Sequence, residues 1–339
     1  MLSLFAAPHS HVPRRMPQVM RQVMFAMLPG IIGLTIAFGP GILVNLLLSM
    51  VTALLTEAWI LRLRHRPVGK TLTDGSAVVT GMLLAVALPA IAPWWIPVLG
   101  TFFAVAVTKQ LFGGLGQNPF NPAMAAYAFL LISFPLEMSL WPQPFEWHIA
   151  GFSWYETADA VTGATPLDAF RHKGMLTAEE FWQQPQLLSP DMVLAWEWVA
   201  LGWALGGVWL LWQRVIHWQA PVGMLSALSL LAAFFYGVDP SHYASPWFHW
   251  VSGATLLSAF FIVTDPVSGA TSRLGQCFFG IGVGILVYVI RTWGNYPDAV
   301  AFAVLLMNFA APTIDYYTRP RVHGHRKAQR GLKQKDSAP

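Results

Sequence analysis

The sequence predicts an all-α polytopic membrane protein with about ten transmembrane helices, arranged as two inverted five-helix halves. Hydrophobic residues make up 55% of the 339 residues, whereas charged residues make up only 11%. A soluble domain would carry about 25% charged residues, so this chain has too few of them to cover a water-exposed surface. The mean hydropathy is +0.51, and apolar segments follow one another almost from end to end. The alternating pattern of a membrane β-barrel does not recur along the chain.

Ten segments are long and apolar enough to be transmembrane helices, each of which needs about 20 residues. They are 22–40, 42–61, 75–92, 94–112, 119–135, 193–213, 219–238, 248–264, 276–292 and 298–315. Five spans in each half would give the two halves opposite orientations, as in inverted repeats. A weak internal similarity between the segments that begin at Thr80-Gly81 and at Ser252-Gly253 supports a repeat.

The basic residues predict how the chain is oriented. With a cytoplasmic N-terminus, seventeen of the twenty Lys and Arg residues fall inside, and only Arg171, Lys173 and Arg291 fall outside. This asymmetry predicts that both termini are cytoplasmic. Because the basic residues flank apolar segments, they indicate a lipid surface and not nucleic acid as the partner. The expected parts are a cytoplasmic N-terminus (1–21), a first half (22–135), an extracytoplasmic loop (136–192), a second half (193–315) and a basic cytoplasmic tail (316–339).

The predicted extracytoplasmic loop contains the motif Asp159-Ala160-Val161-Thr162-Gly163-Ala164-Thr165. Gly163 and Ala164 place little side-chain bulk before Thr165, so its hydroxyl can enter the active site of another enzyme. Asp159 and Thr162 would then serve as polar recognition groups. A polar turn that contains glycine explains the same residues.

The motif resembles the acceptor signature Asp-x-x-(Ser/Thr)-Gly-Ala-(Ser/Thr) of the bacterial flavin transferase. The runs 252–266, 296–306 and 314–321 are similar to the D subunits of Rnf-type ion-translocating electron-transport complexes. The B subunit of the sodium-pumping NADH:quinone oxidoreductases is a more distant relative. This resemblance implies that Thr165 carries FMN in a phosphoester bond. The transferase would recognise the other residues of the motif, which are Asp159, Thr162, Gly163 and Ala164.

Two other segments resemble this motif. The run Ser252-Gly253-Ala254-Thr255 lacks the leading Asp, whereas Asp265-Pro266-Val267-Ser268-Gly269-Ala270-Thr271 fits the whole pattern. The transferase of these systems works on the outer face, and Thr271 precedes Arg273 on the predicted inner face. Thr165 is therefore the predicted acceptor.

A second cofactor pocket is predicted near the inner face. Asn118 and Asn121 lie in a segment rich in Pro and Gly, which membrane proteins tolerate where the backbone lines a cavity or packs in protein. Asp265 reaches the same layer from the eighth predicted span. The family resemblance implies a second, non-covalent flavin there, either riboflavin or FMN. Helix capping by the Asn-Pro pairs is the alternative explanation.

A few further residues stand out within the spans. Glu57 is a carboxylate inside an early span, so it belongs to an ion pathway or reaches the basic cluster at Arg62 and Arg64. Lys109 and Asp74 are expected at the membrane interface. Two pairs of glycines with small-xxx-small spacing predict close helix packing; they are Gly202 with Gly206 and Gly280 with Gly284.

The resemblance also implies a function and a location. The chain would be a membrane subunit, not catalytic alone, of a bacterial inner-membrane complex that connects ferredoxin and NAD while moving sodium ions or protons. Its partners would be the A, B, C, E and G subunits and, during maturation, the flavin transferase. No catalytic residue and no metal site is expected. One alternative is a quinone-reductase B subunit. The other is a non-redox solute channel or transporter with inverted repeats, and such a channel would not need an acceptor threonine.

Overall fold

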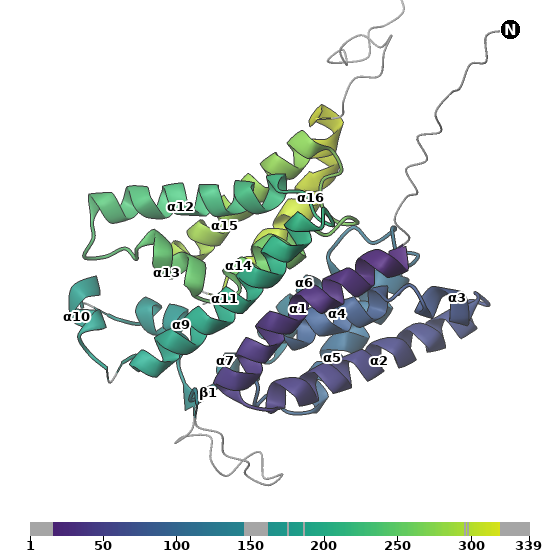
Figure 1. Ribbon diagram of the computed structural model, residues 1–339, viewed down its shortest axis with the longest axis horizontal. Coiled ribbons are helices and arrows are strands. Elements are labelled where there is room, and N and C mark those ends of the chain that lie inside the picture. Colours follow the sequence, from purple (N-terminus) through teal and green to yellow (C-terminus); the bar gives the residue numbers. More distant parts are fainter. Residues whose placement is uncertain are drawn as a thin grey trace, which may run out of the picture.

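The computed structural model describes residues 16–145, 162–174, 176–185, 187–294, 296 and 298–318 (Figure 1). Within these residues, the regular structure is helical except for one small antiparallel sheet, in which β1 (Trp141–Pro142) pairs with β2 (Thr162–Gly163). The prediction of an all-α polytopic membrane protein is confirmed.

Eight helical segments form the first part of the chain. They are α1 (Met16–Phe38), α2 (Gly41–Leu63), α3 (Val68–Leu72), α4 (Ser76–Ala85), α5 (Trp95–Phe102), the π-helical segment η1 (Phe103–Gln110), α6 (Pro122–Ser133) and α7 (Pro135–Ser139). α5 continues directly into η1, so the two together form one span.

The connecting segment and the second half follow. The connecting helices are α9 (Pro166–Arg171) and α10 (Ala178–Trp182). The second half comprises α11 (Pro190–Trp212), α12 (Gln219–Val238), α13 (Pro246–Val251), α14 (Thr255–Leu257), the π-helical segment η2 (Ser258–Ile262), α15 (Arg273–Trp293) and α16 (Val300–Thr318).

Six described helices are long and apolar enough to cross a membrane, namely α1, α2, α11, α12, α15 and α16. They expose large apolar side chains such as Leu47, Leu55 and Phe309, as expected for helices that face lipid. The other four predicted spans are shorter or interrupted. The segment predicted at 94–112 contains α5 and η1. The segment predicted at 119–135 contains α6, which begins only after Asn121.

In each half, a glycine with a positive φ separates two short helices. Gly75 (φ 78°) separates α3 from α4, and Gly253 (φ 64°) separates α13 from α14. Glycine adopts this left-handed conformation without the steric cost that a side chain imposes. The prediction of a continuous helix over 248–264 was therefore wrong. The helix predicted over 75–92 begins as expected but ends at Ala85. Gly253 resembles Gly75 in this respect, since each lies between two short helices.

Contacts between helices pair equivalent elements of the two halves. Between the halves, α1 packs against α11, and α6 packs against α16. Within the first half, α2 contacts α4 and α5. In the second half, α12 contacts α13 and α15 in the same way. Glycines allow the closest approaches: Gly206 faces the carbonyl of Ala26 on α1, and Gly280 faces the carbonyl of Ala220 on α12. The predicted packing role of both glycine pairs is confirmed, since Gly202 and Gly284 also face backbone atoms of the same neighbours.

The two ends of the molecule differ in what they contain. β1, α7, α9 and α10 lie at one end, whereas α3 and the C-terminal end of α16 lie at the opposite end (Figure 1). This arrangement agrees with the predicted sidedness, in which the loop at 136–192 and the chain termini are on different faces.

Candidate functional site

Thr165 follows the small sheet directly and begins a helix. Gly163 pairs with Trp141 across the sheet, and a side chain at this glycine would press against Gln143 and Met192. Ala164 is exposed, and Thr165 is half-buried. Thr165 caps α9, because its Oγ1 accepts a hydrogen bond from the backbone N–H of Asp168 at 3.3 Å. Pro166 at the first position of α9 suits this helix start.

Helix α9 is fixed to the second half, which in turn fixes Thr165. The Arg171 guanidinium donates to the carbonyl of Tyr296 at 2.8 Å. Lys173 donates to the carbonyls of Ser241 and His242 and lies over the ring of Phe170. Partial burial lowers the pKa of Lys173, and the charge of Asp239 opposes this shift. Thr165 is thus attached to packed structure on its C-terminal side.

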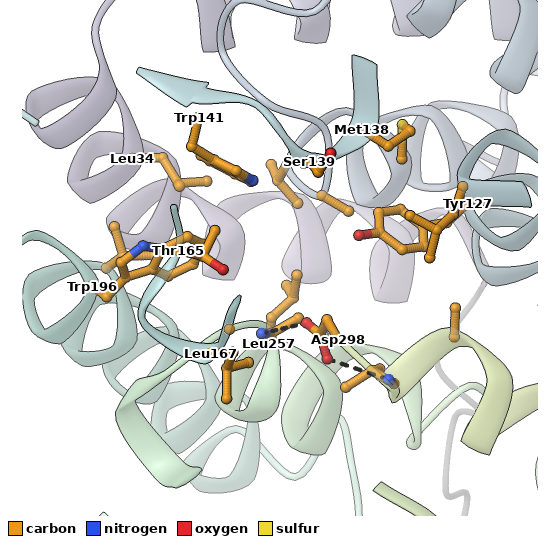
Figure 2. A pocket seen from close by; sticks show the side chains of 18 of the residues that line it. Leu34, Tyr127, Met138, Ser139, Trp141, Thr165, Leu167, Trp196, Leu257 and Asp298 are labelled. Carbon is orange, nitrogen blue, oxygen red and sulfur yellow. Dashed lines mark hydrogen bonds between the residues drawn. The ribbon is translucent and has the colours of Figure 1, made fainter. Parts of the chain in front are cut away.

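Thr165 lines a cavity between the two halves, which we call the Thr165 pocket (Figure 2). Its aromatic wall contains Trp141 and Trp196, whose rings meet edge to face at 5.0 Å. The hydroxyl of Thr165 points into the cavity opposite the hydroxyl of Tyr127 (Figure 2). The indole N–H of Trp196 is buried and has no hydrogen-bond partner among the described residues. The cavity volume is about 80 Å³.

Asp298 lines the Thr165 pocket and forms an ion pair with Arg291, which the sequence did not reveal. Asp298 accepts hydrogen bonds from Arg291 at 3.2 Å and from the backbone N–H of Ala254 at 3.0 Å. Arg291 also donates to Thr255 Oγ1 at 2.9 Å. Arg291 was expected among the outer charges, but it is buried, and its pairing with Asp298 explains how the charge is tolerated.

The two other threonines that resemble acceptors lie in different environments. Thr255 is fully buried, and its hydroxyl donates to the carbonyl of His249 at 2.6 Å, so a transferase could not reach it in this fold. Thr271 is exposed, and its hydroxyl donates to Asp315 at 2.9 Å. Among these three threonines, Thr165 combines partial exposure with a position on a cavity.

Asn118, Asn121 and Asp265 line one common cavity, as the sequence analysis expected of a single pocket. This Lys109 pocket, named after a fourth residue of its lining, has a volume of about 300 Å³ and is formed by elements of both halves. Asn121 Oδ1 caps α6 by accepting from the N–H groups of Ala123 and Met124, so the capping explanation is confirmed for this residue.

The other two residues predicted for this pocket, Asn118 and Asp265, differ from Asn121. Asn118 donates to the carbonyl of Phe120 at 2.9 Å, but its Oδ1 is buried without a hydrogen-bond partner among the described residues. Asp265 accepts from Ser268 Oγ at 2.5 Å and from the N–H of Val267 at 3.3 Å. Asn118 therefore keeps an acceptor for a ligand, whereas Asp265 has part of its capacity occupied.

Glu57 and Lys109 form a buried ion pair beside this pocket. Lys109 Nζ lies 2.7 Å from Glu57 Oε1, and the two residues are 2% and 0% exposed. The alternative in which Glu57 reaches Arg62 and Arg64 is therefore wrong; Arg64 instead donates to the carbonyl of Gln110. The expectation of an interfacial Lys109 was also wrong, because the sequence does not show that η1 turns this residue toward α2.

Some residues of the motif lie outside what the structure describes. Asp159 falls within the undescribed range 146–161, and only the backbone of Thr162 is described. Three pocket residues were not predicted from the sequence: Tyr127 lies on α6, Trp196 on α11, and Asp298 just before α16. The charge of Asp298 beside a predicted span was the one feature of the sequence that could have indicated these pocket residues.

Comparison with known proteins gives a consistent result. The model of the NQR2, RnfD, RnfE family matches residues 3–324. A protein of Pseudomonas aeruginosa (strain UCBPP-PA14), named as the D subunit of an ion-translocating oxidoreductase complex, is 52% identical over 337 residues, which cover 97% of this chain and 98% of that protein. Proteins of the same name from Cellvibrio japonicus (strain Ueda107) and Escherichia coli O1:K1 / APEC are 48% and 47% identical; the alignments cover 98% and 95% of this chain and 97% and 98% of those proteins.

Proposed function

The chain belongs to the NQR2, RnfD, RnfE family, and we propose that it is a redox subunit that carries FMN covalently on Thr165. Its relatives are named as members of an ion-translocating oxidoreductase complex, so the chain is a membrane subunit of such a multi-subunit translocase. The observation that carries the flavin proposal is the half-buried Thr165 hydroxyl, which completes an acceptor motif and opens on an aromatic cavity.

The residues of the Thr165 pocket suit a flavin ring. Trp141 and Trp196 offer aromatic faces. The indole N–H of Trp196, which has no partner within the described part of the chain, can donate to a ring carbonyl or nitrogen. The cavity of about 80 Å³ is smaller than the roughly 300–1,000 Å³ of ligand pockets. The pocket therefore holds an edge of the ring, and the remainder extends toward the loop or a partner subunit. A bound flavin would accept and pass on electrons, while the protein holds and orients it.

We assign a second, non-covalent flavin to the Lys109 pocket. Its volume of about 300 Å³ reaches the range of ligand sites. The free Oδ1 of Asn118 can accept the imide N–H of a flavin ring, and Asp265 can accept from the ribityl hydroxyls. Asn121 positions the lining through its cap on α6. The ligand would be riboflavin or FMN, which differ by one phosphate group.

Within the assembled complex, this subunit would help to connect ferredoxin and NAD with the movement of sodium ions or protons across the bacterial inner membrane. The A, B, C, E and G subunits would be its partners, and a flavin transferase would modify it. The names of the relatives favour the role of a D subunit over that of the quinone-reductase B subunit and over a solute channel.

Mass spectrometry of the purified subunit tests the attachment. The peptide that contains Thr165 should carry the added mass of FMN, and the denatured subunit should fluoresce in a gel. Thr165→Ala should abolish both signals, whereas Thr271→Ala, the matched change in the other complete motif, should leave them intact. An unmodified Thr165 peptide from cells with active transferase would refute the proposal.

A further inference from the structure

Helix α9, which carries the acceptor threonine at its start, rests on two segments of the second half. Leu167 packs in an apolar cluster with Phe248 of α13, and its Cδ1 would lie 2.6 Å from a Cβ atom at Gly253. At the other end of α9, Arg171 donates to the carbonyl of Tyr296 at 2.8 Å. The position of α9 therefore depends on how the helix break at Gly253 and the segment before α16 are held.

One ion pair holds both of these segments. The Arg291 guanidinium on α15 donates to the carbonyls of His249 and Ser252 at the end of α13, at 3.1 and 3.4 Å. It also donates to Asp298, just before α16, at 3.2 Å. Asp298 in turn accepts from the N–H of Ala254, which precedes α14, at 3.0 Å. The pair thus binds the carbonyls that end one short helix and an N–H at the start of the next.

The burial of this pair favours a positioning role over a stabilising one. The side chains of Arg291 and Asp298 are only 2% and 20% exposed. A buried ion pair often adds no net stability compared with apolar residues of similar volume, but it requires a defined geometry. Asp298 also lines the Thr165 pocket. Because Arg291 neutralises its carboxylate, this wall carries no net charge that would oppose a phosphoester on Thr165.

We propose that Arg291 and Asp298 are positioning residues for the flavin acceptor. They hold the surface on which α9 docks, and they thereby direct the Thr165 hydroxyl, and the flavin attached to it, toward the aromatic wall of the Thr165 pocket. Neither residue needs to contact the flavin. The docking of α9 is a property of the unmodified chain, whereas the direction of the flavin rests on the proposed function.

A thiol on the buried face of α9 measures the docking without any flavin. Ala169 is 9% exposed, so Ala169→Cys in a Cys277→Ser background places a thiol that a docked α9 shields from a maleimide. We expect slow labelling of this full-length subunit in detergent, and several-fold faster labelling when Asp298→Asn is added. The matched control is Asp74→Asn, because Asp74 accepts the N–H of Ser76 at the other short-helix start. This control should leave the thiol protected.

A second pair of variants keeps the test decisive if Asp298→Asn does not fold, as judged by size-exclusion chromatography. Gly253→Ala and Gly75→Ala both place a side chain at a positive φ, so both meet the same kind of backbone penalty. A Cβ at Gly253 would also press on Leu167 and lie 3.0 Å from Asp298 Oδ2, whereas a Cβ at Gly75 meets methionine side chains of α1. We expect faster labelling only in Gly253→Ala. Equal labelling of the two variants would overturn the proposal, and so would a protected thiol in folded Asp298→Asn.

The emission of the attached flavin tests its direction. Tryptophan rings quench flavin fluorescence on contact, so a flavin held at Trp141 and Trp196 should be dim in the native subunit and bright after denaturation. Asp298→Asn should raise the ratio of native to denatured emission several-fold, with Thr165→Ala as the blank for non-covalent flavin. A dark denatured parent would refute the covalent flavin but not the docking of α9. A bright denatured parent with an unchanged ratio in folded Asp298→Asn would overturn the positioning role.

Discussion

Thr165 has two roles that substitution can separate. Its Oγ1 caps α9 by accepting the N–H of Asp168, and its hydroxyl faces the Thr165 pocket. A phosphoester at this oxygen keeps the oxygen atom but adds a bulky charged group, so the cap must weaken or rearrange on modification. The packing of Arg171 and Lys173 against the second half then becomes the main restraint on α9.

Substitutions of Thr165 should therefore affect stability and flavin attachment differently. Thr165→Ala removes the cap, which costs about 1 kcal/mol of stability, and it also removes the acceptor. Thr165→Ser keeps both, provided that the transferase accepts a serine. Thermal unfolding in detergent measures the first effect, and in-gel flavin fluorescence measures the second. Loss of fluorescence in Thr165→Ser with unchanged stability would show that the transferase discriminates between the two hydroxyls.

Substitution of the two asparagines of the Lys109 pocket should have different effects, on stability for Asn121 and on flavin content for Asn118. Asn121→Ala removes the cap of α6 and should destabilise the protein by about 1 kcal/mol, whereas Asn121→Ser should restore most of that stability. Asn118→Ala removes a pocket acceptor with little loss of stability, and it should lower the amount of extractable flavin. Thermal unfolding and flavin extraction on the same samples distinguish these outcomes. Equal flavin content in Asn118→Ala and the parent would assign Asn118 to loop structure alone.

At the scale of elements, close helix packing and broken helices have different causes. Gly206 allows α11 to meet α1 because a Cβ there would overlap the carbonyl of Ala26. Gly75 and Gly253 instead supply the left-handed backbone that ends one short helix and begins the next. Such breaks place helix starts inside the protein, where Asp74 accepts from the N–H of Ser76 and Asp298 accepts from the N–H of Ala254.

The packing role of Gly206 can be measured against a glycine without neighbours. Gly206→Ala forces α1 and α11 apart and should cost about 1–3 kcal/mol. Gly237→Ala near the end of α12 meets nothing within 4 Å and should be neutral or slightly stabilising, since Ala favours helix. Thermal unfolding of both variants in the same detergent gives the comparison. Equal effects would mean that the contact between α1 and α11 tolerates expansion.

Hydropathy and spacing predicted the long helices and the glycine contacts, since both are local properties of a sequence. The break at Gly253 was missed because an average over about 20 residues hides one residue with an unusual φ. The early end of α4 at Ala85 was missed because the apolar run continues beyond it. The convergence of Asn118, Asn121 and Asp265 was predictable, because all three lie at span ends on one predicted face. The meeting of Tyr127, Trp196 and Asp298 was not, since it depends on how α6, α11 and the start of α16 pack.

At the scale of the whole molecule, the two pockets lie between the halves and use different elements. The Thr165 pocket is built beside β1 and α9, and the Lys109 pocket beside the starts of α1 and α6. Each contains residues next to one of the two positive-φ glycines: Gly253 itself and Ala254 line the first, and Ser76 lines the second. Basic residues recur as well, since Arg291 on α15 and Lys109 on η1 donate to hydroxyls at these helix starts. The two halves thus share one structural feature, a basic side chain that donates to a hydroxyl at the start of a short helix.

The sidedness of these pockets can be tested with single cysteines, because the chain has only one, Cys277. In a Cys277→Ser background, Ala164→Cys and Gln117→Cys place thiols at two exposed positions, one beside Thr165 and one beside Asn118. A membrane-impermeant maleimide added to intact spheroplasts should label only the thiol at position 164, because the charge asymmetry predicts that Thr165 lies outside and Asn118 inside. Both should react after the membrane is opened with detergent, which controls for burial. Labelling of the thiol at position 117 alone in intact spheroplasts would reverse the topology. Thr165 would then lie on the cytoplasmic face, Thr271 would move to the outer face, and Thr271 would become the threonine that the transferase can reach.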